Sequence, residues 1–120
     1  MEPDDKPWTV SFVDFKKVER ALSKLSPDQL RLALEALFAD FKTHGLTLFR
    51  TSCAKWLGKG LAEYRYREDP DVLVRFFFYL DQGRCVVVLS AYDKGRAPSQ
   101  KRQNMEIARA RKIMEIFSIK

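Results

Sequence analysis

Apolar and polar residues alternate along several short stretches of the chain, which is the pattern of β-strands. Strands are predicted in this way at residues 8–13 (WTVSFV) and 61–68 (LAEYRYRE), and a further strand is predicted at residues 72–80 (VLVRFFFYL). Residues 85–92 (CVVVLSAY) are apolar almost throughout, which favours a strand near the centre of a sheet. The tripeptides at 69–71 (DPD) and 81–83 (DQG) predict turns between these last three strands.

Two helices are predicted between the first and second strands. Apolar residues return at helical spacing from about Asp14. A second helix is expected to begin at residues 26–29 (SPDQ), which combine a capping serine, a proline at the first helical position and a glutamine three residues after the cap. That helix presents one apolar face, and Gly45 is expected to end it. Residues 46–60 show no clear periodicity and are predicted to form a loop.

A last helix is predicted after Pro98 and Ser99, with basic residues around a stripe of apolar ones. The stripe consists of Ile107, Ala110, Ile113 or Met114, and Phe117. The order β-α-α-β-β-β-α predicts an α+β fold with a mostly antiparallel, twisted sheet, a helical hairpin on one face and a C-terminal helix. The length of 120 residues suits a single domain over residues 1–120, with residues 1–7 expected to be flexible.

Successive side chains of a strand point to opposite faces of a sheet, so the predicted strands divide into a core set and a second set. The core set beneath the helices includes Val72, Val74, Phe76 and Phe78. The second set, on the face that the helices leave free, comprises Arg65, Arg67, Arg75, Phe77 and Tyr79. Three arginines on neighbouring strands repel one another unless an anion or an acid lies between them, and Glu63 can offset only one.

A phosphodiester backbone suits the remaining arginine donors, and Tyr92 at the end of the fourth strand is placed to stack a base. Other interpretations of the same pattern stay open. Strand arginines often pair with local acids, Phe77 and Tyr79 can fill a second hydrophobic layer, and the surface can also bind a protein. The strand pattern therefore leaves nucleic-acid binding, protein binding and a purely structural face as alternatives.

The positive charge of the chain is concentrated in two segments. The formal net charge is +6, but residues 1–93 carry 14 Lys and Arg against 14 Asp and Glu, so the whole excess lies in residues 94–120. A second, local excess lies at 50–67, where five basic residues accompany only Glu63. Such asymmetry favours a polyanionic partner, although a solvated basic helix accounts for it equally well.

The sequence argues against several kinds of site. Cys53 and Cys85 lack the spacing of zinc ligands and His44 stands alone, so neither a structural zinc nor a Cys/His nucleophile pair is expected, and no cofactor is predicted. The chain shows neither a signal-like N-terminus nor an apolar run as long as a membrane span. We therefore expect a cytoplasmic protein with reduced cysteines and no membrane partner.

From Lys55 onward the chain resembles the HigB-like, phage-derived branch of the RelE toxin superfamily. The matching motifs are a Lys and a Leu before Gly60, then LAEYR at 61–65, VRFFFY at 74–79, VVVLSAYDKGRAP at 86–98 and MEIARARKIM at 105–114. About half of the chain carries this specific similarity. Members of this family are ribosome-dependent mRNA interferases, the toxins of bacterial toxin–antitoxin modules.

The resemblance implies a reaction and assigns residues to it. Family members turn the ribose 2′-hydroxyl onto the adjacent phosphate, which leaves a cyclic phosphate and a 5′-hydroxyl. Arg65 and Arg75 match the strand arginines that would hold the scissile phosphate. Lys55 or Lys59 matches the lysine expected as base or charge stabiliser, and Tyr92 matches the stacking aromatic residue. Further RNA contacts are expected from Arg67, Lys94, Arg96, Lys101 and Arg102.

The sequence departs from the family pattern at two points. The common paired lysine after the aromatic strand is here Lys94-Gly95, and no histidine lies near the predicted site. A lysine base would need a lowered pKa, and Asp93 is an alternative acid–base residue. The partners implied by the resemblance are mRNA, the ribosome and a cognate antitoxin, expected to be a helix-turn-helix protein. The alternative function is a non-catalytic phage or host relative that binds RNA or a protein through the same basic face.

Overall fold

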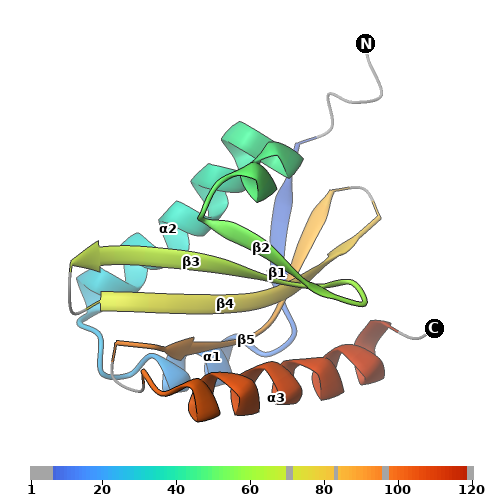
Figure 1. Cartoon of the computed structure of the whole chain (residues 1–120). Coiled ribbons are helices and arrows are strands. Elements are labelled where there is room, and N and C mark those ends of the chain that lie inside the picture. The colour runs from blue at the N-terminus through green and yellow to red at the C-terminus, as the bar shows by residue number, and fades with distance from the viewer. Residues whose placement is uncertain (1–6, 70–71, 83, 96–97, 119–120) are drawn as a thin grey trace.

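The computed structural model describes residues 7–69, 72–82, 84–95 and 98–118, and the elements follow the predicted order with two additions (Figure 1). They are β1 (Thr9–Phe12), α1 (Phe15–Ala21), α2 (Pro27–His44), the 3-10 helix η2 (Gly45–Arg50), β2 (Ala54–Gly58), β3 (Leu61–Asp69), β4 (Val72–Asp81), β5 (Cys85–Asp93) and α3 (Gln100–Ser118). The predicted α+β fold class is confirmed. Within the described ranges, no helix is both long and apolar enough to span a membrane.

The described strands form one five-stranded sheet in the order β1-β5-β4-β3-β2 (Figure 1). β1 runs parallel to β5, and the other neighbouring pairs are antiparallel, as predicted. The apolar strand β5 lies inside the sheet, next to the central strand β4. The register of β3 with β4 places Arg65 opposite Arg75, and the register of β4 with β5 places Tyr92 opposite Arg75. Side chains from three strands therefore meet in one row across the sheet.

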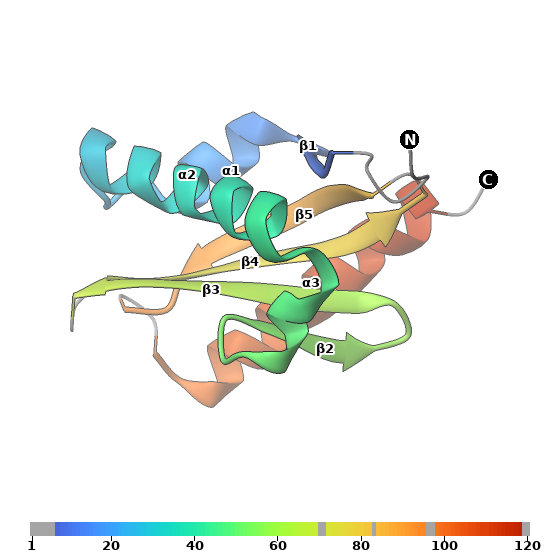
Figure 2. The same cartoon turned by 90° about the horizontal axis from the view of Figure 1, so that it is seen from above.

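The helices α1 and α2 cover one face of the sheet (Figure 2). The core between these helices and the sheet contains the predicted set of residues from β4, namely Val72, Val74, Phe76 and Phe78. The predicted start of α2 is confirmed, because Ser26 Oγ accepts from the Gln29 N–H and Gln29 Oε1 accepts from the Ser26 N–H. This reciprocal cap contributes about 1 kcal/mol to the helix. The helix ends at His44, directly before Gly45, as expected.

The segment at 46–60, predicted as a loop, contains most of η2 and the edge strand β2. Gly45 makes the turn into η2 possible: its φ is +53°, and a Cβ at this position would lie 2.9 Å from Trp8 Nε1. The 3-10 helix buries Leu48 in the main core. β2 has only five residues (AKWLG), which is too short a run for strand periodicity to be visible.

The helix α3 packs on the opposite face of the sheet, which was predicted to be free of helices, and the alternative that Phe77 and Tyr79 fill a second hydrophobic layer is confirmed (Figure 2). Two residues of that face, Phe77 and Tyr92, are fully buried in a second apolar cluster together with Ala110. The apolar stripe of α3 is confirmed except at Phe117, which is 44% exposed. The face is covered because strand alternation places the aromatic side chains of Phe77 and Tyr92 on it, and the apolar side of α3 packs over them.

The boundaries of the strands differ from the predicted ones by single residues. β1 covers 9–12 rather than 8–13, and each of β3, β4 and β5 extends one residue beyond its predicted end. The predicted turns include Pro70, Asp71 and Gly83, which lie outside the described residues. Residues 1–6, part of the segment expected to be flexible, also lie outside them.

Candidate functional site

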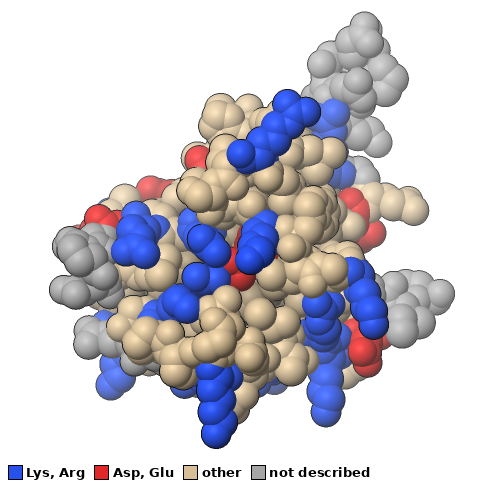
Figure 3. Space-filling view, viewed as in Figure 1, with Lys and Arg blue, Asp and Glu red and all other residues tan. Residues whose placement is uncertain are grey.

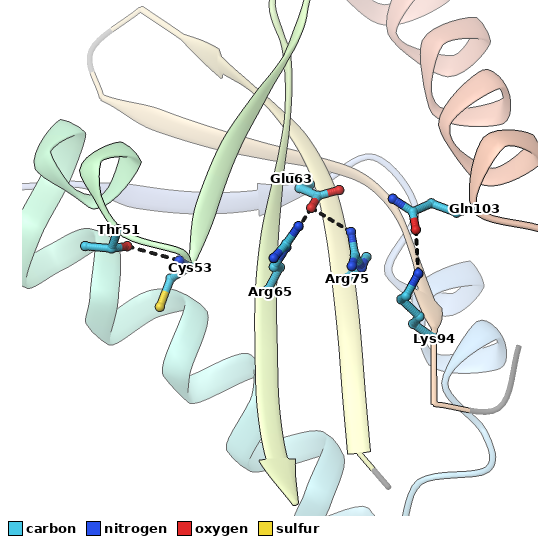
Figure 4. Close-up of polar contacts among 7 residues, drawn as sticks. All are labelled: Thr51, Cys53, Glu63, Arg65, Arg75, Lys94 and Gln103. Carbon is cyan, nitrogen blue, oxygen red and sulfur yellow. Dashed lines mark hydrogen bonds and ion pairs between the residues drawn. The ribbon is translucent and has the colours of Figure 1, made fainter. Parts of the chain in front are cut away.

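Glu63 is the centre of an ion-pair cluster on the side of the sheet that faces α3 (Figure 4). Its Oε2 accepts from Arg65 Nε at 2.9 Å and from Arg75 Nη1 at 2.8 Å. The side chains of Glu63 and Arg75 are only 1% and 7% exposed, whereas that of Arg65 is 35% exposed. Because one carboxylate neutralises only one of the two guanidinium charges, the cluster keeps a net positive charge.

A groove of about 210 Å³ opens beside this cluster. It is lined by Ser52, Cys53, Arg65, Arg67, Leu73 and Arg75, and we call it the basic groove. Figure 3 shows Lys and Arg side chains gathered over the region of β3 and β4, with an acidic patch among them. The strand pattern thus placed these three arginines correctly on one surface. Among the described residues, the buried Nε of Arg75 has no hydrogen-bond partner.

Lys94 lies beside the basic groove, at the end of β5. Its backbone N–H donates to the carbonyl of Leu73, a groove residue, at 2.8 Å. Its Nζ donates to Gln103 Oε1 of α3 at 2.6 Å (Figure 4). Partial burial lowers the pKa of Lys94 below the usual range, and the positive charge of Arg75 lowers it further. Lys94 therefore lies beside the groove, and its pKa is lowered in the direction that favours a lysine base.

Tyr92, predicted to stack an RNA base, is only 1% exposed. Its ring lies parallel to that of Phe77, with 5.9 Å between the ring centroids. Burial raises the pKa of the Tyr92 hydroxyl. Tyr79 on the same face is partly buried against the same cluster. The ring of Tyr92 is therefore not presented to a base in this structure, because α3 covers the face on which it lies.

Lys55 and Lys59, the two candidates for the catalytic lysine ahead of β3, lie at different places. Lys55 is exposed and stands opposite Glu63 in the pairing of β2 with β3. Residues paired in this way have Cβ atoms about 5 Å apart, so Lys55 shares the surface of the ion-pair cluster. Lys59 lies in the β2–β3 turn with a φ of +55°, and six residues of chain, about 20 Å when extended, separate it from Arg65. The fold thus brings Lys55, but not Lys59, to the cluster.

Of the other predicted RNA-binding residues that the structure describes, Arg67 alone lines the groove. Arg67 is exposed and lines the groove itself, and Lys101 is exposed on α3. Arg102 Nε pairs with Glu106 Oε2 at 2.7 Å, so the charge of Arg102 is partly neutralised. Arg96 lies outside the described residues.

Residues 20–115 match the family of proteins described as phage derived protein Gp49-like (DUF891). The chain belongs to this family. The matched range contains α2, every residue of the basic groove and almost all of α3. No curated protein and no solved structure gave a significant match. Membership of the Gp49-like family agrees with the resemblance to phage-derived, RelE-like toxins, and it does not single out the HigB-like branch.

Four residues at or beside the groove of this Gp49-like protein were not predicted: Ser52, Cys53 and Leu73, which line the groove, and Gln103, which accepts a hydrogen bond from Lys94. The first two lie in the segment taken for a loop, where Thr51 Oγ1 accepts from the Cys53 N–H at 3.0 Å (Figure 4). The Cys53 carbonyl then accepts from the Arg65 N–H at 2.7 Å. The adjacent Thr and Ser were the available signal, since such residues form local turn hydrogen bonds. Gln103 gave no signal, because its role depends on how α3 docks.

The hydrogen-bond donors that the groove offers a ligand are mainly cationic groups. They are the guanidinium groups of its three arginines and, beside it, the ammonium group of Lys94. Cys53 and Cys85 are free thiols. In the described part of the chain, no three His, Cys, Asp or Glu side chains are grouped so that they could hold a metal ion.

Proposed function

We propose that this Gp49-like protein is a toxin endoribonuclease of the HigB-like branch that cleaves mRNA on the ribosome. The observation that carries the proposal is the basic groove, where Arg65, Arg67 and Arg75 line a space large enough for a phosphodiester group and Lys94 lies beside it. The reaction class is the one implied by the resemblance of the strand motifs to RelE-like toxins, and membership of the Gp49-like family supports that resemblance. A cognate antitoxin, expected to be a helix-turn-helix protein, would silence the toxin.

The arginines would stabilise the charge that develops on the phosphate. In the proposed reaction the 2′-hydroxyl gives its proton to a base, O2′ bonds to phosphorus, and the P–O5′ bond breaks as O5′ takes up a proton. Negative charge grows on the non-bridging oxygens, where fixed cationic donors are most effective. Arg65 is exposed enough to reach a bound phosphate, whereas the nearly buried Arg75 would contribute its positive charge from the wall of the groove.

We assign the base to Lys94 and the proton donor for O5′ to Lys55. Lys94 combines a lowered pKa with a place beside the groove, so its neutral amine can accept the proton of the 2′-hydroxyl. Lys55 is exposed on the surface of the ion-pair cluster. Asp93, the alternative acid–base residue, is 7% exposed and is therefore poorly accessible to RNA.

The products of cleavage test this function directly. Purified protein is mixed with mRNA alone and with mRNA on programmed ribosomes, and the ends of any fragments are analysed. We expect cleavage only with ribosomes, downstream fragments with a 5′-hydroxyl, and upstream fragments with a cyclic phosphate. Intact mRNA in both mixtures, under conditions where the protein binds RNA, would contradict catalysis.

One structural feature favours the non-catalytic alternative, and the same experiment addresses it. Glu63 already occupies Nε of Arg65 and Nη1 of Arg75, so part of the donor capacity of the groove is used internally. A protein that binds RNA or a partner through this face without cleaving RNA would give binding but no fragments.

The assignment of Lys94 predicts how cleavage depends on pH. The rate should rise with pH and level off below the ordinary lysine pKa of 10.5, because the neutral amine becomes populated earlier than in an exposed lysine. Lys94→Arg should lower the rate by about 100-fold or more and remove this rise, since arginine stays protonated. Single-turnover cleavage measured across neutral and mildly alkaline pH checks the prediction. Lys112→Arg, a substitution at an exposed position of α3, is the matched control. If the pH dependence of the cleavage rate is unchanged in Lys94→Arg, another residue is the base.

A further inference from the structure

Trp56 on the edge strand β2 is an exposed aromatic ring held from behind by the core. It is 48% exposed, and its ring stacks on Phe49 of η2 with 4.1 Å between centroids and 5° between planes. Phe49 is fixed in turn, because its ring contacts those of Phe41 and Phe78 in the main core. One face of the indole thus rests on a rigid support, while much of the side chain remains open to a ligand.

The chain around Trp56 carries positive charge and no acid. No Asp or Glu occurs between Asp40 and Glu63 in the sequence. Within that interval the exposed cations nearest to Trp56 in the sequence are Arg50, Lys55 and Lys59. Arg111 of α3 adds a further cation, since its guanidinium donates to the carbonyls of Leu57 and Gly58 at 2.6 and 3.0 Å. An exposed ring close in sequence to several exposed cations is an arrangement with which proteins bind single-stranded nucleic acid.

β2 also links Trp56 to the basic groove. Cys53, which lines the groove, lies just before β2, and Trp56 follows three residues later, about 10 Å along extended chain. Lys55 and Trp56 point to opposite faces of β2, and β2 is the last strand at its edge of the described sheet. A single strand of RNA that leaves the groove across this edge would meet a cation on one side and an aromatic ring on the other.

We propose that Trp56 stacks a base of single-stranded RNA next to the nucleotide whose phosphate occupies the basic groove. This inference rests on the proposed function, because it extends the RNA path from that groove. It assigns to Trp56 the stacking role that Tyr92, buried under α3, does not have in this structure. Base stacking on an aromatic ring tolerates every base, so Trp56 would set affinity and the position of the strand rather than sequence preference.

Charge favours RNA over a protein as the ligand of Trp56. Protein interfaces centred on tryptophan have an apolar core from which charged residues are depleted. Here exposed cations lie close in sequence on both sides of the ring, at Arg50, Lys55 and Lys59. A polyanion neutralises all of them, whereas a protein would need a matching acidic surface.

The intrinsic fluorescence of the protein tests the proposal without a destabilising change. The chain has two tryptophans, and Trp8 is partly buried against Phe41. We expect a short single-stranded RNA to quench the emission of the wild-type protein, and we expect no quenching in Trp56→Phe, which retains only Trp8. Binding is followed independently by the fluorescence anisotropy of a labelled RNA. Trp56→Phe should keep most of the affinity, and Trp56→Leu should lose about 5- to 30-fold.

The outcomes separate this inference from the proposed function. If RNA binds by anisotropy but does not quench wild-type emission, and Trp56→Leu binds as tightly as the wild type, Trp56 has no stacking role while the basic groove remains a binding site. If no RNA binds at low salt, both proposals fail. If Trp56→Leu retains RNA affinity but loses antitoxin binding, the surface belongs to a protein partner and the inference is overturned. Thermal melting of both variants checks that they remain folded.

Discussion

Arg65→Ala is expected to slow mRNA cleavage by about 100- to 1,000-fold and to abolish growth arrest, with little effect on the fold. Arg65 is the more exposed arginine of the cluster, and it faces the groove in which the phosphate is proposed to bind. Its loss removes a fixed donor from the developing charge of the transition state. Glu63 keeps its bond to Arg75, so the cost in folding free energy should be only about 1 kcal/mol.

Growth after induction and single-turnover cleavage on ribosomes measure this effect, and denaturation in urea measures the stability. Arg31→Ala is the control, because Arg31 is also an arginine with carboxylate partners, Asp28 and Glu35, but lies on the helix that covers the opposite face of the sheet. Arg31→Ala should leave cleavage unchanged. If Arg65→Ala cleaves as fast as Arg31→Ala, Arg65 does not contact the reacting phosphate.

Strand periodicity was sufficient to place the three groove arginines on one surface. Residues two apart in a strand share a face whatever the rest of the fold does, so Arg65 and Arg67 had to lie together. The antiparallel pairing of β3 with β4 then brought Arg75 opposite Arg65. The same rule separated Phe76 and Phe78 of the main core from Arg75 and Phe77.

The exposure of those residues could not be predicted in the same way. Whether Tyr92 is free or buried depends on where α3 docks, and an apolar stripe on a helix does not specify which face of the sheet it covers. The position of Gln103 against Lys94 follows from the same docking. β2 was missed for a local reason, because five residues that include a glycine show too little alternation.

The ion-pair cluster contributes both to the stability of the fold and to the proposed reaction. Glu63 holds Arg65 and Arg75 in place while leaving one positive charge uncompensated. Without the acid, two arginines would face each other across paired strands at a partly buried site. With it, they are fixed in advance of ligand binding, which removes the cost of ordering them when a phosphate arrives. Glu63 is in this view a positioning residue rather than a reacting one.

Glu63→Ala is therefore expected to destabilise the fold by about 3–5 kcal/mol, because it leaves the nearly buried Arg75 without its carboxylate partner and in repulsion with Arg65. Urea denaturation at neutral pH measures the loss. Glu35→Ala is the matched control, since Glu35 is an exposed acid paired with Arg31 and should cost less than about 0.5 kcal/mol.

Inorganic phosphate should restore part of the stability of Glu63→Ala and have less effect on the wild type. The substitution converts the cluster into a site with two unpaired guanidinium groups, and an anion that binds the folded state stabilises it by mass action. Urea midpoints measured with phosphate and with chloride at equal ionic strength separate specific binding from screening. If Glu63→Ala is as stable as Glu35→Ala, or if phosphate and chloride act alike on it, the carboxylate does not hold the two arginines against their mutual repulsion.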